Sequence, residues 1–180
     1  MTNPKRIYLA GPEVFFPAAE HQAIVAEKKR LLQENGLEGV DPLDTELALS
    51  ASEAKFRRGH RIYRANRELM DSCQAIIANL TPFRGISADP GTVFEVGYMI
   101  GQGKPAFGFT LESRYYRERA GATDLDELGH TIEDFEMSDN LMIEGGIYSS
   151  GGQLFVAEQP GEHRYFSAEL FRRCVRAIKK

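Results

Sequence analysis

The chain has 180 residues and a net charge of −4, and 42% of its residues are hydrophobic. This composition is typical of a soluble globular protein, and we expect one domain over residues 1–180. The net negative charge argues against a nucleic-acid-binding or membrane-surface protein, because both kinds of protein need a basic face. There is no apolar run long enough for a membrane span and no signal-peptide pattern, so we expect a cytoplasmic location.

Strands and helices alternate along most of the chain. Their βαβ spacing predicts an α/β fold built on a doubly wound parallel sheet. The polar segment 43–52 is expected to be a loop, and 111–165 is less regular than the rest of the chain. The expected elements are a strand at 6–10, a helix from 17 to 35, a brief strand at 39–42, a helix at 53–73, a strand at 74–80, a helix at 92–101, a strand at 106–110 and a last helix capped by Ser167, with Phe166 and Phe171 as a hydrophobic staple.

The cysteines and histidines predict neither a disulfide nor a metal site. Cys73 and Cys174 lie in apolar helical contexts without CxxC spacing, so we expect two buried free thiols. No dinucleotide, Walker A or serine-hydrolase motif is present, and no cofactor is expected. The four histidines are scattered in polar surroundings, which indicates surface positions: His21, His60, His130 and His163.

The stretch 79–98 holds the most informative chemistry. It reads as the end of a buried strand, a glycine-rich loop and a helix start, with Asp89 and Glu95 flanking the helix start. Ligands of open α/β sheets bind just outside the carboxyl ends of the strands, where these carboxylates are expected to lie. Two interpretations of Glu95 stay open. A capping box with Thr92 is slightly favoured by the residues alone, whereas the neighbouring glycines Gly91 and Gly97 favour a ligand site.

Three further polar residues also allow a structural and a functional interpretation. Asp89, placed before a Pro-Gly pair, is suited to forming a turn. Asn66 lies on the apolar stripe of the long helix, where its amide must find a backbone group or a ligand hydroxyl. Tyr8 lies in the first strand, and most strand tyrosines are packing residues.

These residues together resemble the nucleoside 2-deoxyribosyltransferase family. The resemblance spans about residues 5–141, and the Asp-x5-Glu-x-Gly-Tyr element is its most specific part. It implies a flavodoxin-like three-layer sandwich that transfers 2-deoxyribosyl groups between nucleobases. The matching segments are Ile7-Tyr8-Leu9-Ala10-Gly11-Pro12, Asn66 with Glu68-Leu69, the run from Asp89 to Tyr98, Gly103-Lys104-Pro105, and Ser138-Asp139-Asn140.

The resemblance also implies roles for single residues. Glu95 matches the nucleophile that holds the sugar covalently, Asp89 the acid that protonates the departing base, and Tyr8 the residue that orients the nucleophile. Asn140 matches an asparagine lent by a neighbouring subunit to the sugar 5′-hydroxyl, which implies a homo-oligomer with shared sites. Asn66 stands where many members carry an aspartate, and an amide can bond a hydroxyl but cannot take up a proton.

The implied partners are 2′-deoxynucleosides and free nucleobases. A carboxylate beneath the anomeric carbon stabilises the oxocarbenium-like transition state, and two displacements retain the configuration. Gly11 and Gly91 are placed where the backbone can approach a ligand. The loop aromatics either stack on the base or fold back onto the core, with equal support: Phe15, Phe16 and Phe83.

Two rival functions remain. A nucleoside or nucleoside 5′-monophosphate N-glycosidase would share the fold and the glutamate but hydrolyse the bond. The acidic, aromatic loop 11–17 disfavours a phosphate, while Arg84 and Ser87 keep this alternative open. A non-catalytic nucleoside or nucleotide sensor would bind without turnover and tolerate loss of Glu95.

Overall fold

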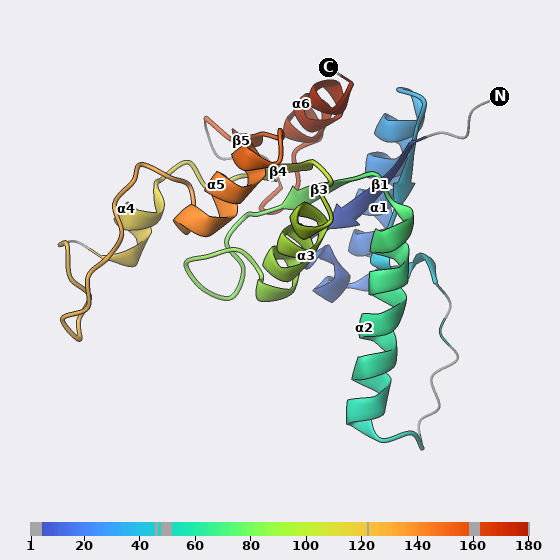
Figure 1. Cartoon of the computed structure of the whole chain (residues 1–180), viewed down its shortest axis with the longest axis horizontal. Helices are drawn as coiled ribbons and strands as arrows, with labels where there is room; N and C mark the ends of the chain where they lie inside the picture. Colours follow the sequence, from blue (N-terminus) through green and yellow to red (C-terminus); the bar gives the residue numbers. More distant parts are fainter. Residues whose placement is uncertain (1–4, 46, 48–51, 122, 159–162, 180) are drawn as a thin grey trace.

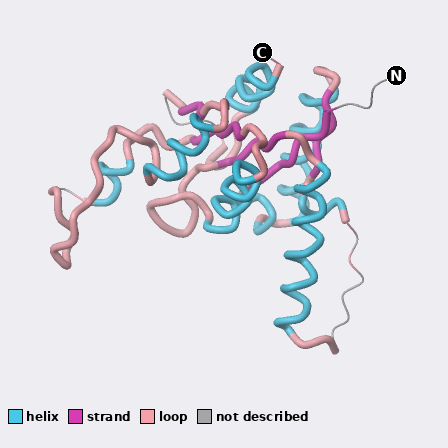
Figure 2. Tube along the Cα trace, in the orientation of Figure 1, coloured by secondary structure: helices cyan, strands magenta, loops and turns pink. Residues whose placement is uncertain are grey.

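The computed structural model describes residues 5–45, 47, 52–121, 123–158 and 163–179, so part of the expected loop at 43–52 lies outside the described residues. Within these residues, five parallel strands form one sheet in the order β2-β1-β3-β4-β5, with helices on both faces (Figures 1 and 2). The predicted α/β class and doubly wound parallel sheet are confirmed. The strands are β1 (Lys5–Ala10), β2 (Leu37–Val40), β3 (Ala75–Asn79), β4 (Ala106–Thr110) and β5 (Leu154–Val156).

The helices form the two outer layers. One core cluster joins the sheet to α1 (Ala18–Gln33) and α6 (Ala168–Ile178), and the other joins it to α2 (Lys55–Ser72), α3 (Pro90–Gly101) and α5 (Leu141–Ser149). Successive strand residues point to opposite faces, and β1 follows this rule. Ile7 and Leu9 belong to the first cluster, whereas Tyr8 and Ala10 belong to the second, so Tyr8 points to the layer that holds α3.

The order of the strands reverses between β1 and β3. The chain runs from β1 to β2 on one side and then returns to β3 on the other, and ligands of such sheets bind where the order reverses. The loop after β1 contains a short 3-10 turn, η1 (Pro12–Phe15), and the loop after β3 leads into α3. A second 3-10 turn, η2 (Pro42–Asp44), follows β2. These three loops meet the carboxyl edge of the sheet.

The segment expected to be irregular contains more structure than predicted. It holds α4 (Tyr116–Ala120), α5 and the short strand β5. We call residues 111–121 and 123–140, between β4 and α5, the excursion, and Figure 1 shows them reaching away from the sheet. The last helix is as expected: Ser167 Oγ accepts from Leu170 N over 3.3 Å, and the Phe166 and Phe171 rings lie 6.4 Å apart.

The long helix α2 packs on the sheet with only part of its length. Its N-terminal turns extend past the sheet in Figure 1, and Ile62, expected on the buried stripe, is 40% exposed. Ala65 and Met70 further along are buried. Among the described residues, no helix has both the length and the apolar character that crossing a membrane demands.

Candidate active site

Glu95 meets the hydroxyl of Tyr8 in the layer between the sheet and α3. Tyr8 Oη donates a hydrogen bond of 2.8 Å to Glu95 Oε1. Tyr8 lies in the middle of β1 and is fully buried, whereas Glu95 lies on the second turn of α3 and is half-buried. The contact joins two residues 87 positions apart, so the fold brings together the two side chains that the resemblance paired.

The capping interpretation of Glu95 was wrong. α3 begins at Pro90, two residues earlier than predicted, and Asp89 is its N-cap. Asp89 Oδ2 accepts from Thr92 N over 3.0 Å and from Thr92 Oγ1 over 3.2 Å. The cap therefore occupies one oxygen of Asp89 and leaves Oδ1 for another partner. Because Asp89 caps the start of α3, Glu95 does not act as a cap. Its carboxylate accepts the hydrogen bond from Tyr8 instead.

The electrostatics of the site favour a proton-holding glutamate. Burial raises the pKa of Glu95 to about 7, and the negative charges of Asp89 and Asp41 act in the same direction. The hydrogen bond from Tyr8 opposes them and lowers that pKa. Burial and the nearby Glu95 charge raise the pKa of Tyr8 far above its usual value. Tyr8 thus remains a donor at any working pH, while Glu95 titrates near neutrality.

Asn66 is half-buried rather than buried, in the C-terminal half of α2. One helical turn before it, Tyr63 contacts Phe94 with ring centroids 6.2 Å apart. Beyond it, Asp71 Oδ1 accepts a hydrogen bond of 2.7 Å from Tyr98 Oη. Asn66 therefore lies between two contacts that join α2 to the helix of Glu95.

The two candidate glycines differ in what surrounds them. At Gly11, a Cβ would lie 1.9 Å from Glu13 Oε2, so a larger residue there would displace the Glu13 carboxylate. At Gly91, a Cβ would lie 3.0 Å from Asp89 Oδ2, beside the candidate acid. Gly91 is exposed, so the backbone next to Asp89 is open to a ligand.

The loop aromatics contact one another. The Phe15 and Phe83 rings stack with centroids 5.6 Å apart and an angle of 9° between their planes. Phe16 lies 5.1 Å from Tyr165, and the Arg84 guanidinium lies 4.7 Å from the rings of both Phe15 and Phe83. A base inserted between Phe15 and Phe83 would first have to separate them. Phe15 remains 51% exposed at the loop surface.

Asn140 caps a helix of its own chain. Its Oδ1 accepts from Met142 N over 3.0 Å at the start of α5, and its Nδ2 donates to Glu133 Oε2 over 3.0 Å. The preceding Asp139 accepts hydrogen bonds from the loop before Asp89. The Ser-Asp-Asn segment therefore joins the end of the excursion to the candidate site loop.

Sequence reasoning missed a buried ion pair and a buried contact between a histidine and a carboxylate. Lys28 Nζ donates to Glu13 Oε1 over 2.6 Å, and Asn79 Nδ2 donates to the same oxygen over 2.9 Å. The surface position expected for His21 was wrong, because it is 8% exposed and its Nε2 lies 3.4 Å from Asp41 Oδ1. A signal existed for both basic side chains: Lys28 and His21 lie three or four residues from the apolar stripe of α1, and so on its buried side.

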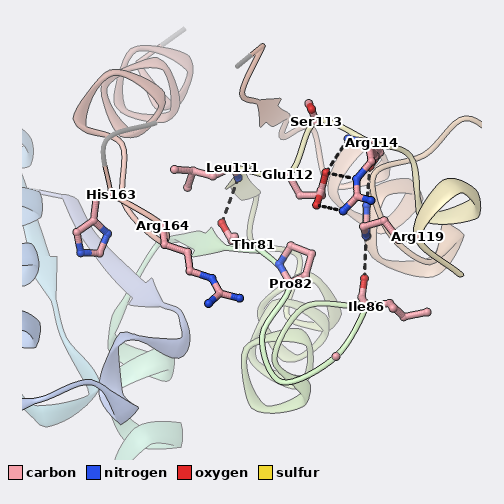
Figure 3. A pocket seen from close by; sticks show the side chains of 11 residues that line it. Thr81, Pro82, Ile86, Leu111, Glu112, Ser113, Arg114, Arg119, His163 and Arg164 are labelled. Atoms are coloured by element: carbon pink, nitrogen blue, oxygen red, sulfur yellow. Dashed lines mark hydrogen bonds and ion pairs between the residues drawn. The ribbon is translucent and has the colours of Figure 1, made fainter. Parts of the chain in front are cut away.

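A cavity of about 620 Å³ opens beside the ends of β3 and β4 (Figure 3). Glu112 and Arg114 form an ion pair of 2.8 Å on its wall, and Arg119 donates to Ile86 O. Tyr8, Asp89 and Glu95 are not among its lining residues. The residues that line it are Thr81, Pro82, Gly85, Ile86, Leu111, Glu112, Ser113, Arg114, Arg119, His163 and Arg164.

Solved structures share the architecture. A 2-deoxyribosyltransferase from Leishmania mexicana is 28% identical with a TM-score of 0.69, covering 96% of this chain and 98% of that chain. A conserved protein from Enterococcus faecalis is 21% identical with a TM-score of 0.61, covering 97% and 99% of the two chains. A CMP N-glycosidase from Clostridium botulinum is 14% identical with a TM-score of 0.52, covering 94% and 96%. The last two show likeness of fold alone.

Sequence comparison gives a more specific result. An uncharacterized protein from Schizosaccharomyces pombe is 34% identical over 172 residues, covering 84% of this chain and 80% of that protein. The family model for nucleoside 2-deoxyribosyltransferase matches residues 7–142, which include Tyr8, Asp89, Glu95 and Asn140. The chain therefore belongs to the nucleoside 2-deoxyribosyltransferase family.

Proposed function

We propose that this protein transfers the 2-deoxyribosyl group between nucleobases through a covalent intermediate on Glu95. The observation that carries the proposal is the 2.8 Å hydrogen bond from Tyr8 to Glu95, in surroundings that raise the pKa of Glu95 to about 7. Asp89 is the acid and Tyr8 orients the nucleophile. Membership of the family supports the reaction class, and the proposed substrates are 2′-deoxynucleosides and free nucleobases.

In the first step, a Glu95 oxygen forms a bond to the anomeric carbon while the bond from that carbon to the base breaks. The electron pair stays on the base nitrogen, and the base takes a proton from Asp89. Tyr8 holds Oε1, so Oε2 is the oxygen free to attack. Burial disfavours the Glu95 anion, and formation of a neutral ester relieves that penalty.

In the second step, the acceptor base attacks the same carbon from the face that the first base left. Its nitrogen gives up a proton to the Asp89 carboxylate, and the Glu95 ester oxygen departs with its electron pair. Each displacement inverts the carbon, so the product keeps the original configuration. The acceptor must outcompete water for the intermediate, which a partly enclosed site favours.

We expect base exchange to appear when the protein is incubated with 2′-deoxyinosine and free adenine. Chromatography should show β-2′-deoxyadenosine forming as adenine is consumed, because both displacements occur on one glutamate. Product with the α-configuration would contradict the double displacement. Release of hypoxanthine without any exchange would favour hydrolysis, and binding without turnover would favour the sensor.

The monophosphate alternative is tested in the same assay with 2′-deoxyinosine 5′-monophosphate. Three observations bear on the monophosphate, the first against it and the other two in its favour. Ser87 donates its hydroxyl to Asp139, so it is engaged within the chain. The charge of Glu13 is compensated by Lys28, so this residue no longer argues against a phosphate near the first loop. Arg84 is exposed, so a guanidinium is available at the rim of the loop.

A sugar contact from Asn140 to a neighbouring subunit stays a prediction. Its amide oxygen and amide nitrogen each make one hydrogen bond within the chain, to Met142 N and Glu133. A side-chain amide offers two donors and two acceptor lone pairs. Asn140 can therefore cap α5 and still offer one donor and one lone pair to a 5′-hydroxyl.

We expect kcat/KM to rise with pH through about 7, because the nucleophile is the deprotonated form of Glu95. Tyr8→Phe removes the hydrogen bond that lowers this pKa, so the rising limb should move to higher pH. The loss of rate should consequently be larger at pH 6 than at pH 8. Tyr148→Phe, at an exposed position of α5, is the matched control. An unshifted limb in Tyr8→Phe would show that Tyr8 does not act on Glu95.

A further inference from the structure

Asp139 is a buried carboxylate that binds the loop just before the candidate acid. It is 3% exposed. Its Oδ1 accepts from the Ser87 hydroxyl and its Oδ2 accepts from Ala88 N over 2.8 Å. Oδ1 also accepts from Asn140 N over 2.8 Å. Each of these groups is a donor, so a carboxylate satisfies them all, whereas an amide would place an N–H₂ against one of them.

Arg119 joins the same two segments through a second set of hydrogen bonds. Its Nε donates to Ile86 O over 2.9 Å, as Figure 3 shows, and its Nη2 donates to Ser138 O over 2.7 Å. Its Nη1 donates to Arg114 O over 2.6 Å. The guanidinium is planar and presents its donors in a fixed fork, so it holds these carbonyls at set positions. Residues 86–88 and 138–139 are thus joined by two different side chains.

The hydrogen bonds of Asp139 and Arg119 restrict the position of the backbone that carries Asp89. The amide of Ala88, immediately before it, is fixed by Asp139, and the amide of Thr92 is fixed by Asp89 Oδ2. The backbone that carries Asp89 is therefore held at both ends, one end by the start of α3 and the other by the excursion. The contacts to Asp139 span 51 and 52 residues along the chain, so α3 alone does not provide them.

We infer that Asp139 is a positioning residue for the acid Asp89, acting through Ser87 and Ala88 with Arg119 as its support. The inference rests on the proposed function, because it concerns the proton that Asp89 gives to the departing base. A misplacement of about 1 Å in a catalytic group can cost about 100-fold in rate. The excursion would then serve the reaction by fixing the acid rather than by touching the substrate.

The test compares two substrates that differ in their need for an acid. Hypoxanthine must gain a proton to leave 2′-deoxyinosine as a neutral base. The base of 2′-deoxy-7-methylguanosine already carries a positive charge, so it leaves as a neutral base without gaining a proton. Asp139→Asn should lower kcat on 2′-deoxyinosine by about 10- to 100-fold and leave the methylated substrate nearly unchanged. Ser87→Ala, which removes one contact and is the milder variant, should show the same selectivity. Asp134→Asn, at an exposed position of the excursion, is the matched control.

Hydrogen–deuterium exchange supplies a second readout that does not depend on activity. The peptide covering residues 84–94 should exchange faster in Asp139→Asn and Ser87→Ala than in the wild type or Asp134→Asn. Equal losses on both substrates, or unchanged exchange of this peptide, would overturn the inference. If the wild type releases neither base, the proposed function fails, and the exchange measurement then decides alone whether Asp139 holds the loop.

Discussion

Glu95→Gln is expected to abolish turnover while the protein stays folded. Removal of the nucleophile closes the covalent route, and comparable losses of a nucleophile cost on the order of 10⁴-fold or more in kcat. The glutamine can still accept the hydrogen bond that Tyr8 donates to Oε1 in the wild type. Initial rates of base exchange and a thermal melt on the same sample measure both effects.

The sign of the change in stability caused by Glu95→Gln follows from the pKa of Glu95. The folded-state pKa of Glu95 is raised from 4.5 to about 7, so the folded protein holds the proton more tightly than the unfolded chain. The resulting stabilisation is complete below pH 4.5 and is lost as the pH rises through about 7. At pH 8 the neutral glutamine should therefore make the protein at least as stable as the wild type. A less stable Glu95→Gln that keeps its activity would restore a purely structural role for Glu95.

Two controls sharpen the result. Glu34→Gln, at the exposed end of α1, should change neither rate nor melting temperature appreciably. Acid quenching of the wild type during turnover should leave a deoxyribosyl group on the peptide that contains Glu95, detectable by mass spectrometry. The label should be missing from Glu95→Gln, and a label on any other peptide would assign the nucleophile elsewhere.

Lys28→Met is expected to destabilise the fold more than any surface substitution. Lys28 and Glu13 are 2% and 3% exposed, and the lysine also lies 5.7 Å from the centre of the Phe109 ring. Removing one member of a buried pair leaves the other charge uncompensated, which costs about 3–5 kcal/mol. Chemical denaturation should show this loss, and the melting temperature should fall by about 10 °C.

The neighbouring lysine provides the control. Lys29 pairs with Asp44 over 2.5 Å, but both side chains are more than one third exposed. Lys29→Met should therefore change the free energy of unfolding by at most about 1 kcal/mol. The double variant Glu13→Gln with Lys28→Met should recover part of the loss, because the amide that replaces the Glu13 carboxylate is uncharged and can still accept from Asn79. A Lys28→Met protein as stable as Lys29→Met would show that the buried pair contributes nothing.

The central part of the fold could be predicted from the sequence because its signals are local. The apolar strands β1, β3 and β4 and the capped helix α6 each lie within a residue or two of their expected places. α5 was missed because two glycines interrupt its pattern, and β5 because a strand of three residues has no measurable period. The full length of α2 was predicted, but its exposed beginning was not, since periodicity does not tell where the sheet ends.

The candidate site was harder to predict from the sequence than the fold, because its contacts join residues far apart in the chain. The resemblance, rather than spacing, paired Tyr8 with Glu95, and local pattern alone slightly favoured a cap for the glutamate. Asp89 took the capping position instead, which a Pro-Gly pair after it allows. The support that Asp139 gives to Ala88 crosses 51 residues, and no periodicity in the chain indicates such a partner.

The outer strands of the sheet bear on how the protein behaves at high concentration. In the part of the chain that the structure describes, β2 and β5 form the two edges and have four and three residues, against six in β1. An edge strand offers unpaired backbone groups to other chains, and a short edge offers few. Glu38 adds a charge on β2, where it pairs with Arg6 over 3.1 Å. The sheet that positions Tyr8 is thus poorly suited to pairing edge to edge, which protects the folded protein against aggregation through its strands.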